Sequence, residues 1–218
     1  MKKTLVLLAV IIFTGITATS FAQKNRTLSK GFSINLIAGI PSTNYGLPSD
    51  SNIDSEQKYG PLVGLQIGSR WYFSPGDKFG VGLMVNWFDI TAAYKSTTSP
   101  LYKMDRVTVD VTLLEVGPVA TFALTDDIAI DAYYNLRPTG LATVFAYSSD
   151  SGDYDESDAY AGFGVSHALG TAFRWKVLSI GAEYVVGKIK CENTDTEATY
   201  EPEKFMVNNF RIMLGVKF

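Results

Sequence analysis

The last stretch of the chain, NNFRIMLGVKF from Asn208 to Phe218, decides the fold. Every second residue from Phe210 onward is apolar, whereas the residues between them include charged side chains and a glycine. Alternation with a period of two is typical of a β-strand that has two unlike faces. Chain ends usually fray, so a wholly apolar face that runs to the final residue indicates a strand held by neighbours on both edges.

The same alternation fills most of the chain after residue 22 and predicts eight strands. No stretch with a helical period competes with them in quality. The expected strands are 31–40, 60–73, 78–89, 107–123, 128–136 (with an extension to 145 left open), 159–175, 178–187 and 205–218. The sequence therefore predicts one all-β domain, 23–218.

The links between these strands alternate in length. Short links lie at 74–77, 124–127 and 176–177, and the first two contain the Pro-Gly and Asp-Asp pairs that are typical of turns. The other links are long: 41–59, 90–106, a third that ends near Asp158, and 188–204. In an up-and-down antiparallel arrangement, all long links emerge at one end of the molecule. This asymmetry is typical of outer-membrane barrels, whose long loops face outside.

The two faces of each strand distinguish a membrane barrel from a soluble one. In 78–89 the face of Phe79 and Trp87 is apolar, whereas the opposite face holds Gly80, Gly82 and Asn86. Small residues suit the crowded interior of an eight-stranded barrel, so the apolar face is expected to contact lipid. A composition of 46% hydrophobic and 19% charged residues agrees with this. Aromatic residues also sort toward the two strand ends, as in the girdles of membrane barrels.

The fourth expected strand changes phase in its middle. Apolar residues fall on odd positions up to Leu113 and on even positions from Leu114 onward. One extra residue inserted into the strand restores the alternation on both sides. We therefore expect a β-bulge near Leu113 and Leu114.

The first 22 residues read as a cleavable signal peptide. Lys2 and Lys3 precede an almost purely apolar run, and small residues end the segment at Ala22. The apolar run is shorter than the roughly 20 residues that a spanning helix needs. We expect cleavage between Ala22 and Gln23, and a glutamine at this position does not fit a lipoprotein signal.

Charged residues on the inward face are predicted to form an ion-pair network. Buried charges persist only when they are paired and hydrogen-bonded. We expect Glu183 to lie near Arg211, with Glu115 joining them or pairing with Arg137. A selectivity ring in a conducting pore is the alternative, although eight strands leave little room. The inward set is Arg70, Asp110, Glu115, Asp131, Arg137, Arg174, Glu183, Arg211 and Lys217.

Several chemistries lack their residues in this sequence. The chain has one histidine and one cysteine, so common transition-metal sites and nucleophilic dyads lack partners, and we expect no cofactor. His167 follows Ser166 directly, which places the two side chains on opposite faces of a strand. A net charge of -3 does not favour nucleic acid. We therefore expect no enzymatic activity.

Three features fall in the expected long links. The segment 147–160 carries five carboxylates and no basic residue, which fits either a solvated acidic loop or a weak Ca²⁺ site. The link 90–106 has the opposite sign, with Lys95, Lys103 and Arg106 available to lipopolysaccharide phosphates. Cys191 is expected in the last link without a partner.

Taken together, the signal peptide, the eight strands, the loop asymmetry and the terminal FRIMLGVKF resemble the small outer-membrane β-barrel family of Gram-negative bacteria, of the OmpA and OmpX type. The resemblance covers the mature chain, but it is one of pattern. It implies that the barrel assembly machinery recognises the terminal strand as an assembly signal, through Phe210, Ile212, Leu214, Val216 and Phe218.

The resemblance also implies location and a general role. We expect an outer-membrane monomer with extracellular loops and periplasmic termini, surrounded by lipid and lipopolysaccharide. Its expected role is structural or surface interaction, with loops that bind lipopolysaccharide, another ligand or a host surface. A small diffusion channel and a lipid A-modifying enzyme are the alternatives.

Overall fold

The computed structural model describes residues 27–49, 59–98, 103–148, 154–194 and 201–218. The expected signal peptide, with its cleavage site at Ala22 and Gln23, lies outside these ranges, as do Asp150 and Asp153 of the carboxylate set in 147–160. The strands are β1 (Gly31–Pro41), β2 (Leu62–Pro75), β3 (Phe79–Thr98), β4 (Lys103–Ala123), β5 (Ile128–Ser148), β6 (Tyr154–Trp175), β7 (Leu178–Asn193), β8 (Glu203–Met206) and β9 (Asn209–Lys217). Within the described ranges no helix is long and apolar enough to cross a membrane.

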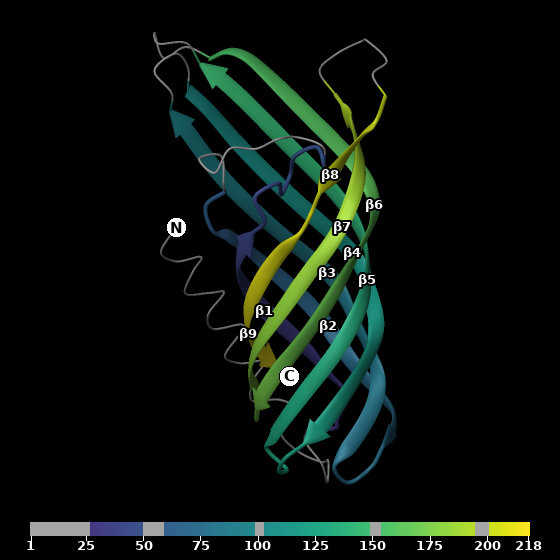
Figure 1. Ribbon diagram of the computed structural model, residues 1–218. Coiled ribbons are helices and arrows are strands. Elements are labelled where there is room, and N and C mark those ends of the chain that lie inside the picture. Colours follow the sequence, from purple (N-terminus) through teal and green to yellow (C-terminus); the bar gives the residue numbers. More distant parts are fainter. Residues whose placement is uncertain (1–26, 50–58, 99–102, 149–153, 195–200) are drawn as a thin grey trace, which may run out of the picture.

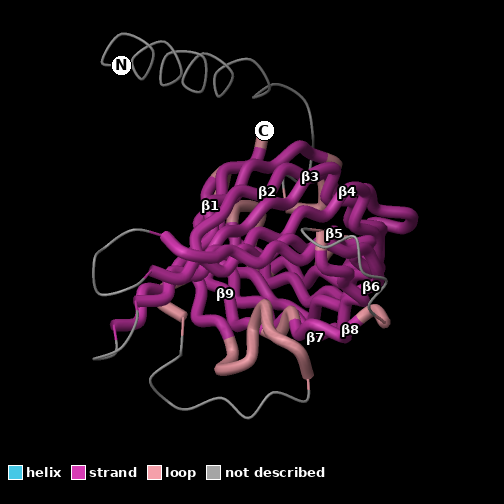
Figure 2. Tube along the Cα trace, turned by 90° about the horizontal axis from the view of Figure 1, so that it is seen from above, coloured by secondary structure: helices cyan, strands magenta, loops and turns pink. Residues whose placement is uncertain are grey.

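The strands close into a ring (Figure 1). Each strand pairs antiparallel with its sequence neighbour from β1 to β7, and β9 pairs with both β7 and β1. The short β8 continues the line of β9 along β7, so together they fill the eighth position. Seen from above, strand makes up nearly all of the described chain (Figure 2). The predicted eight-stranded antiparallel up-and-down barrel is confirmed.

The strands extend further toward the long-loop end than the sequence predicted. The expected link 90–106 is wrong, because β3 continues to Thr98 and β4 begins at Lys103. The extension of the fifth strand, which the sequence left open, reaches Ser148, and β7 runs through Cys191 to Asn193. In β3 and β7 the outward face of these ends carries polar residues such as Ser96, Lys188 and Lys190, so the outward apolar pattern stops although the backbone ladder continues.

The single strand expected over 205–218 is interrupted. The break lies at Val207 and Asn208, between β8 and β9. There the side-chain oxygen of Asn208 accepts a hydrogen bond from the amide of Gly187 at 3.0 Å, in place of a regular ladder bond. The amide of Val207 donates to the carbonyl of the same glycine at 3.1 Å, so β7 still holds this edge.

Two irregularities decide which side chains face inward. The β4–β5 register shifts between Thr112 and Val116, and Leu114 has a φ of 61°, so the predicted bulge is confirmed. A second shift, in the β2–β3 pairing beside Trp87, was not predicted. It reverses the parity of β3 and turns Asp89 into the lumen, where that side chain is fully buried.

The outer surface is apolar and the interior is polar. Leu36, Phe163 and Leu169 are 64%, 69% and 65% exposed, and many other large apolar side chains on the strands are exposed beside them. The inner face instead buries Arg, Asp, Glu, Asn and Thr side chains. A belt of exposed apolar residues around a closed ring is the surface that a lipid bilayer requires.

Candidate functional site

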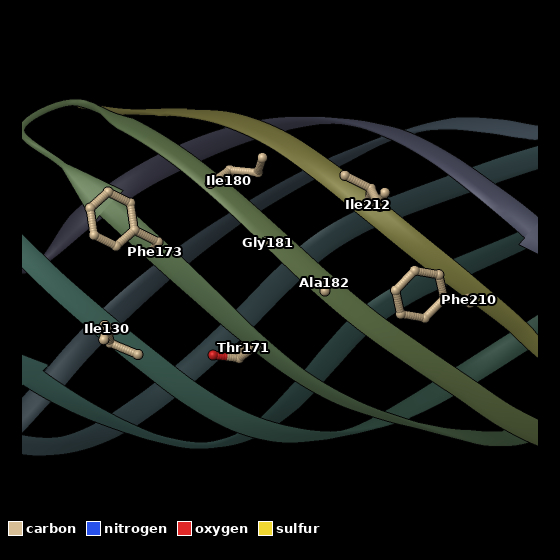
Figure 3. Close-up of a pocket in the computed structure, with 8 residues that line it drawn as sticks. All are labelled: Ile130, Thr171, Phe173, Ile180, Gly181, Ala182, Phe210 and Ile212. Carbon is tan, nitrogen blue, oxygen red and sulfur yellow. The ribbon is translucent and has the colours of Figure 1, made fainter.

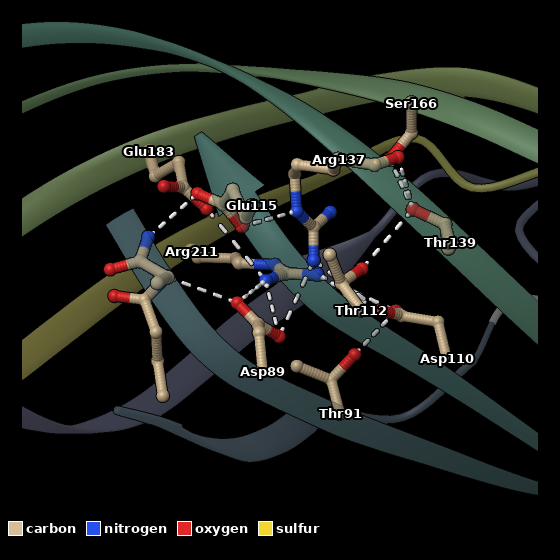
Figure 4. Close-up of polar contacts among 12 residues, drawn as sticks. Asp89, Thr91, Asp110, Thr112, Glu115, Arg137, Thr139, Ser166, Glu183 and Arg211 are labelled. Atoms are coloured by element: carbon tan, nitrogen blue, oxygen red, sulfur yellow. Dashed lines mark hydrogen bonds and ion pairs between the residues drawn. The ribbon is translucent and has the colours of Figure 1, made fainter. Parts of the chain in front are cut away.

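A cluster of six charged side chains fills the middle of the lumen (Figure 4). It comprises Asp89, Asp110, Glu115, Arg137, Glu183 and Arg211, and we call it the central tier. Glu115 Oε2 lies 2.8 Å from Arg137 Nε, and Asp89 Oδ2 lies 3.0 Å from Arg211 Nη1. Glu183 Oε1 is 3.7 Å from Arg211 Nη1. Each of these side chains is at most 1% exposed.

Neutral donors add hydrogen bonds to the ion pairs of the central tier. Its four carboxyl groups outnumber its two guanidinium groups, so the arginines alone leave acceptors unmatched. Asn86 and Asn135 each donate an amide hydrogen bond to Glu115, at 2.7 and 2.6 Å. Tyr45 donates its hydroxyl to Asp110 at 2.6 Å. The tier is thus a packed network of ion pairs and hydrogen bonds, in which both carboxylate oxygens of Glu183 and Nη1 of Arg137 make no hydrogen bond with the described residues.

A second tier lies nearer the short turns. Arg174 donates two hydrogen bonds to the carboxylate of Asp131, at 2.7 Å from Nε and 2.9 Å from Nη2. Arg70 Nε stands 3.7 Å from the same carboxylate. Lys217 donates from Nζ to the backbone oxygen of Ser29 at 2.7 Å, which ties the last strand to the segment before β1.

All nine inward residues named from the sequence are buried on the inner face. The structure brings Glu115 to Arg137 and Glu183 to Arg211, and it separates Arg70, Asp131, Arg174 and Lys217 into the second tier. The sequence reasoning missed Asp89 because strict parity along β3 points it outward. The adjacent apolar residues Trp87 and Phe88 were the available signal of a phase change.

The segment 42–49 folds into the mouth of the barrel, and we call it the plug segment. It pairs with β8, with the amide of Gly46 donating to Met206 at 2.7 Å and the amide of Met206 to Leu47 at 3.0 Å. Gly46 has a φ of +62°, and a Cβ there would collide with the side chain of Thr108. Tyr45 of this segment is fully buried. Sequence reasoning did not find the segment, because hydrophobic periodicity does not show how a link packs.

Above the central tier the lumen becomes apolar and aromatic. Phe145, Ile189 and Phe205 are buried together there, with Tyr45 and Leu47 from the plug segment. Arg106, expected in a loop, instead lies on the inner face of β4, with its guanidinium carbon 3.9 Å from the centre of the Tyr59 ring. Burial raises the pKa of Tyr59 to about 12, so this phenol stays neutral beside the cation.

Three lysines form a basic patch on the outer surface at the long-loop end, and we call it the basic rim. It comprises Lys188 and Lys190 on β7 and Lys204 on β8, all exposed. Lys190 is directly opposite Lys204 in the β7–β8 register. On the other side of β7, Lys190 faces the exposed Phe163. Below the rim, the outward residues of β7 are the apolar Tyr184 and Val186.

The single histidine faces outward and has a tyrosine for its partner. His167 Nδ1 lies 2.6 Å from the hydroxyl of Tyr134, and the two rings stack with centroids 5.9 Å apart. Ser166 points into the lumen, where its hydroxyl lies 2.7 Å from that of Thr139. A wall of the barrel therefore separates Ser166 from His167. In the described part of the chain, no three His, Cys, Asp or Glu side chains are grouped as a metal site requires.

The terminal strand is paired on both edges. Phe210, Ile212 and Leu214 face outward and are exposed, and Leu214 lies opposite Leu36 of β1. The amide of Phe218 donates to the carbonyl of Phe32 at 2.8 Å, and the two rings lie 6.4 Å apart. Pairing with β1 and β7 leaves this strand no free edge.

The closed ring, the apolar exterior and the packed charged lumen define a small transmembrane β-barrel protein. Among solved structures, the chain is similar to Ail, the attachment invasion locus protein of Yersinia pestis, at 15% identity, covering 87% of this chain and 97% of that one with a TM-score of 0.46. Ail in complex with the heparin analogue sucrose octasulfate matches at 16% identity over 87% and 97% of the two chains, with a TM-score of 0.44.

The outer membrane channel DcaP of Acinetobacter baumannii is more distant, at 11% identity over 84% of this chain and 71% of that one, with a TM-score of 0.16. No protein-family profile and no curated protein sequence matches the chain. Similarity at this level does not transfer function, because one fold hosts many activities.

Proposed function

We propose that this chain is a monomeric integral outer-membrane protein with a structural and surface-interaction role, and that its basic rim binds phosphate groups of lipopolysaccharide. In this proposal residues 1–22 are removed as a signal peptide and 23–218 form the barrel. The long-loop end faces the exterior, and the short turns and both termini face the periplasm. The observation that carries the proposal is the basic rim at the upper edge of the apolar belt.

Two lysines of the rim lie directly opposite each other, and the carboxylate of Glu192 is exposed on the same face of β7. Like charges directly opposite each other in a β-ladder destabilise the pair, and Lys190 faces Lys204 in this way. An anion held between the two ammonium groups turns that repulsion into attraction. Lysines close to an anionic membrane surface contribute about 1 kcal/mol each. Phosphates of an outer-leaflet glycolipid lie at this boundary, because the apolar residues of β7 end at Val186 just below.

The filled lumen argues against the diffusion-channel alternative. Arg137, Arg211 and their carboxylate partners have no exposed side-chain surface, so a water-sized sphere does not reach them. Opening a path requires the separation of buried ion pairs, each of which costs several kcal/mol to break. Purified protein in planar bilayers is expected to show no stable open steps, and regular single-channel steps would refute this part of the proposal.

The placement of Ser166 and His167 argues against the enzyme alternative. A nucleophile and its base must lie within hydrogen-bond reach, whereas these residues point to opposite sides of the barrel wall. Lipid A from cells with and without the protein is expected to have the same acyl pattern by mass spectrometry. A changed pattern would revive an enzymatic role.

The decisive experiment removes the charges of the basic rim. The variant Lys188→Gln/Lys190→Gln/Lys204→Gln is compared with Lys30→Gln/Lys78→Gln/Lys176→Gln, which removes three exposed lysines near the short turns. Binding of lipopolysaccharide to purified protein is measured at low salt. At about 1 kcal/mol per lysine, the rim variant is expected to bind about 100-fold more weakly, and the control as wild type does. Equal affinity of the two variants would sink the proposal.

A further inference from the structure

The outer wall formed by β5, β6, β7 and β9 carries an apolar groove (Figure 3). Its floor is set by Thr171 and Ala182, which are small and lie directly opposite each other across β6 and β7. Larger outward side chains border this floor, and the groove has a volume of about 440 Å³. The bordering residues are Ile130, Phe173, Ile180, Phe210 and Ile212.

The groove continues toward the short turns. A second hollow of about 450 Å³ shares Phe173 and Ile180 with the first and extends to Trp175 and Leu178 at the end of the β6–β7 hairpin. The hydroxyl of Thr171 already donates to the backbone oxygen of Asp131 at 2.8 Å, so it does not require a polar ligand. The two hollows therefore lie next to each other on the outer wall and share the cross-strand pair Phe173 and Ile180.

The groove lies below the basic rim on the same strands. Lys188 is six residues above Ala182 on β7, a height of about 15 Å at ~3.3 Å per residue and ~40° tilt. Lys204, on β8, belongs to the strand line that continues into β9 and its groove residues Phe210 and Ile212. The basic rim, which can contact an anionic head group, thus lies directly above the apolar groove along the membrane normal.

We propose that this groove binds one acyl chain of a lipopolysaccharide molecule whose phosphate contacts the basic rim. The inference rests on the proposed function and makes it specific, since it names one lipid-facing wall and one chain of the lipid. Charge favours a lipid over a second copy of this protein, because two copies joined through this wall bring two sets of three lysines together. An anionic, acylated lipid matches both the rim and the groove.

The test fills the groove and leaves the rim intact. Ala182→Phe places a large side chain on the groove floor. Ala120→Phe on β4 is the matched control, since Ala120 pairs with Ala132, which pairs with Thr171, so it lies in the same cross-strand row but outside the groove. Folding of each full-length variant is checked by heat-modifiable migration, and Ala182→Leu replaces Ala182→Phe if the latter does not fold.

Retention is measured by native mass spectrometry with three probes: hexa-acylated diphosphorylated lipid A, the same lipid after removal of its ester-linked chains, and phosphatidylglycerol. Wild type and Ala120→Phe are expected to retain lipid A equally, and Ala182→Phe at least tenfold less. The de-acylated probe is expected to bind wild type and Ala182→Phe alike, and phosphatidylglycerol is expected to bind more weakly than lipid A.

Two results would refute the proposal that the groove binds an acyl chain. Equal retention of lipid A by Ala182→Phe and Ala120→Phe would remove the acyl site, while loss of binding in the rim variant would still uphold the proposed function. A dimer of wild type that Ala182→Phe converts to monomer would assign the groove to a second copy instead. If the rim variant and the Ala182 variants all bind lipid A as wild type does, both the proposed function and the acyl-chain site in the groove are refuted.

Discussion

Replacing Arg211 by methionine removes the cation that links most of the central tier. The guanidinium lies 3.0 Å from Asp89 and 3.4 Å from Asp110, and its Nε donates to Asn209 at 2.7 Å. With no exposed surface at the site, water does not replace these partners. Four carboxyl groups then share Arg137 alone.

Breaking a buried ion pair by removing one partner costs about 3–5 kcal/mol, because the other charge stays buried without compensation. We expect Arg211→Met to lower the free energy of unfolding by that amount. Arg211→Lys, which keeps the charge but loses the planar fork, is expected to cost less. Urea unfolding in lipid vesicles, followed by tryptophan fluorescence, measures both variants.

A double mutant separates electrostatics from packing. Asp89→Asn combined with Arg211→Met removes one charge of each sign, so the pair is expected to cost at least 1 kcal/mol less than the sum of the single changes. Lys176→Met, whose ammonium stands 4.0 Å from Asp127 at an exposed turn, is the control and is expected to change stability by less than about 0.5 kcal/mol. A loss below about 1 kcal/mol for Arg211→Met, or strict additivity in the double mutant, would refute the view that the tier is held by this charge.

Three further changes probe the plug segment, the upper strands and the terminus. Tyr45→Phe leaves Asp110 without its 2.6 Å donor and is expected to cost about 1–3 kcal/mol in the same urea assay; an unchanged midpoint would contradict the burial of Tyr45. Burial raises the pKa of the Cys191 thiol to about 12. At pH 8 maleimide is therefore expected to label the unfolded protein and not the folded barrel. Rapid labelling of the folded barrel, measured by mass spectrometry, would contradict the burial of this thiol. Phe218→Ser removes the ring packed on Phe32 and is expected to reduce the heat-modifiable fraction in outer membranes several-fold. Phe163→Ser, at an exposed aromatic residue opposite Lys190 of the basic rim, is expected to have a smaller effect.

Alternation predicted the barrel and most of its inner charges because parity is a property of the strand itself. The bulge at Leu114 was visible for the same reason, since the apolar residues change from odd to even positions around it. Parity predicts the wrong face where a bulge leaves little trace in the sequence. The register shift beside Trp87 is such a case, and it turns Asp89 inward. It also fails above the membrane belt, where Thr98 and Lys103 continue strands with no hydrophobic pattern. The plug segment depends on contacts with β8, and no local rule in 42–49 encodes them.

The filled lumen determines where this barrel can act. A solute that crosses the centre must separate Arg211 from Asp89 and Arg137 from Glu115, and these side chains have no water around them to take over the lost contacts. At several kcal/mol for each broken pair, such a path is populated less than about once in 10⁴ molecules. Exchange with the surroundings is therefore confined to the outside of the wall and to the long-loop end. In the part of the chain that the structure describes, the wall of β6, β7 and β9 joins the basic rim to an apolar groove. Variants that change Ala182 and the rim lysines separately measure each contribution.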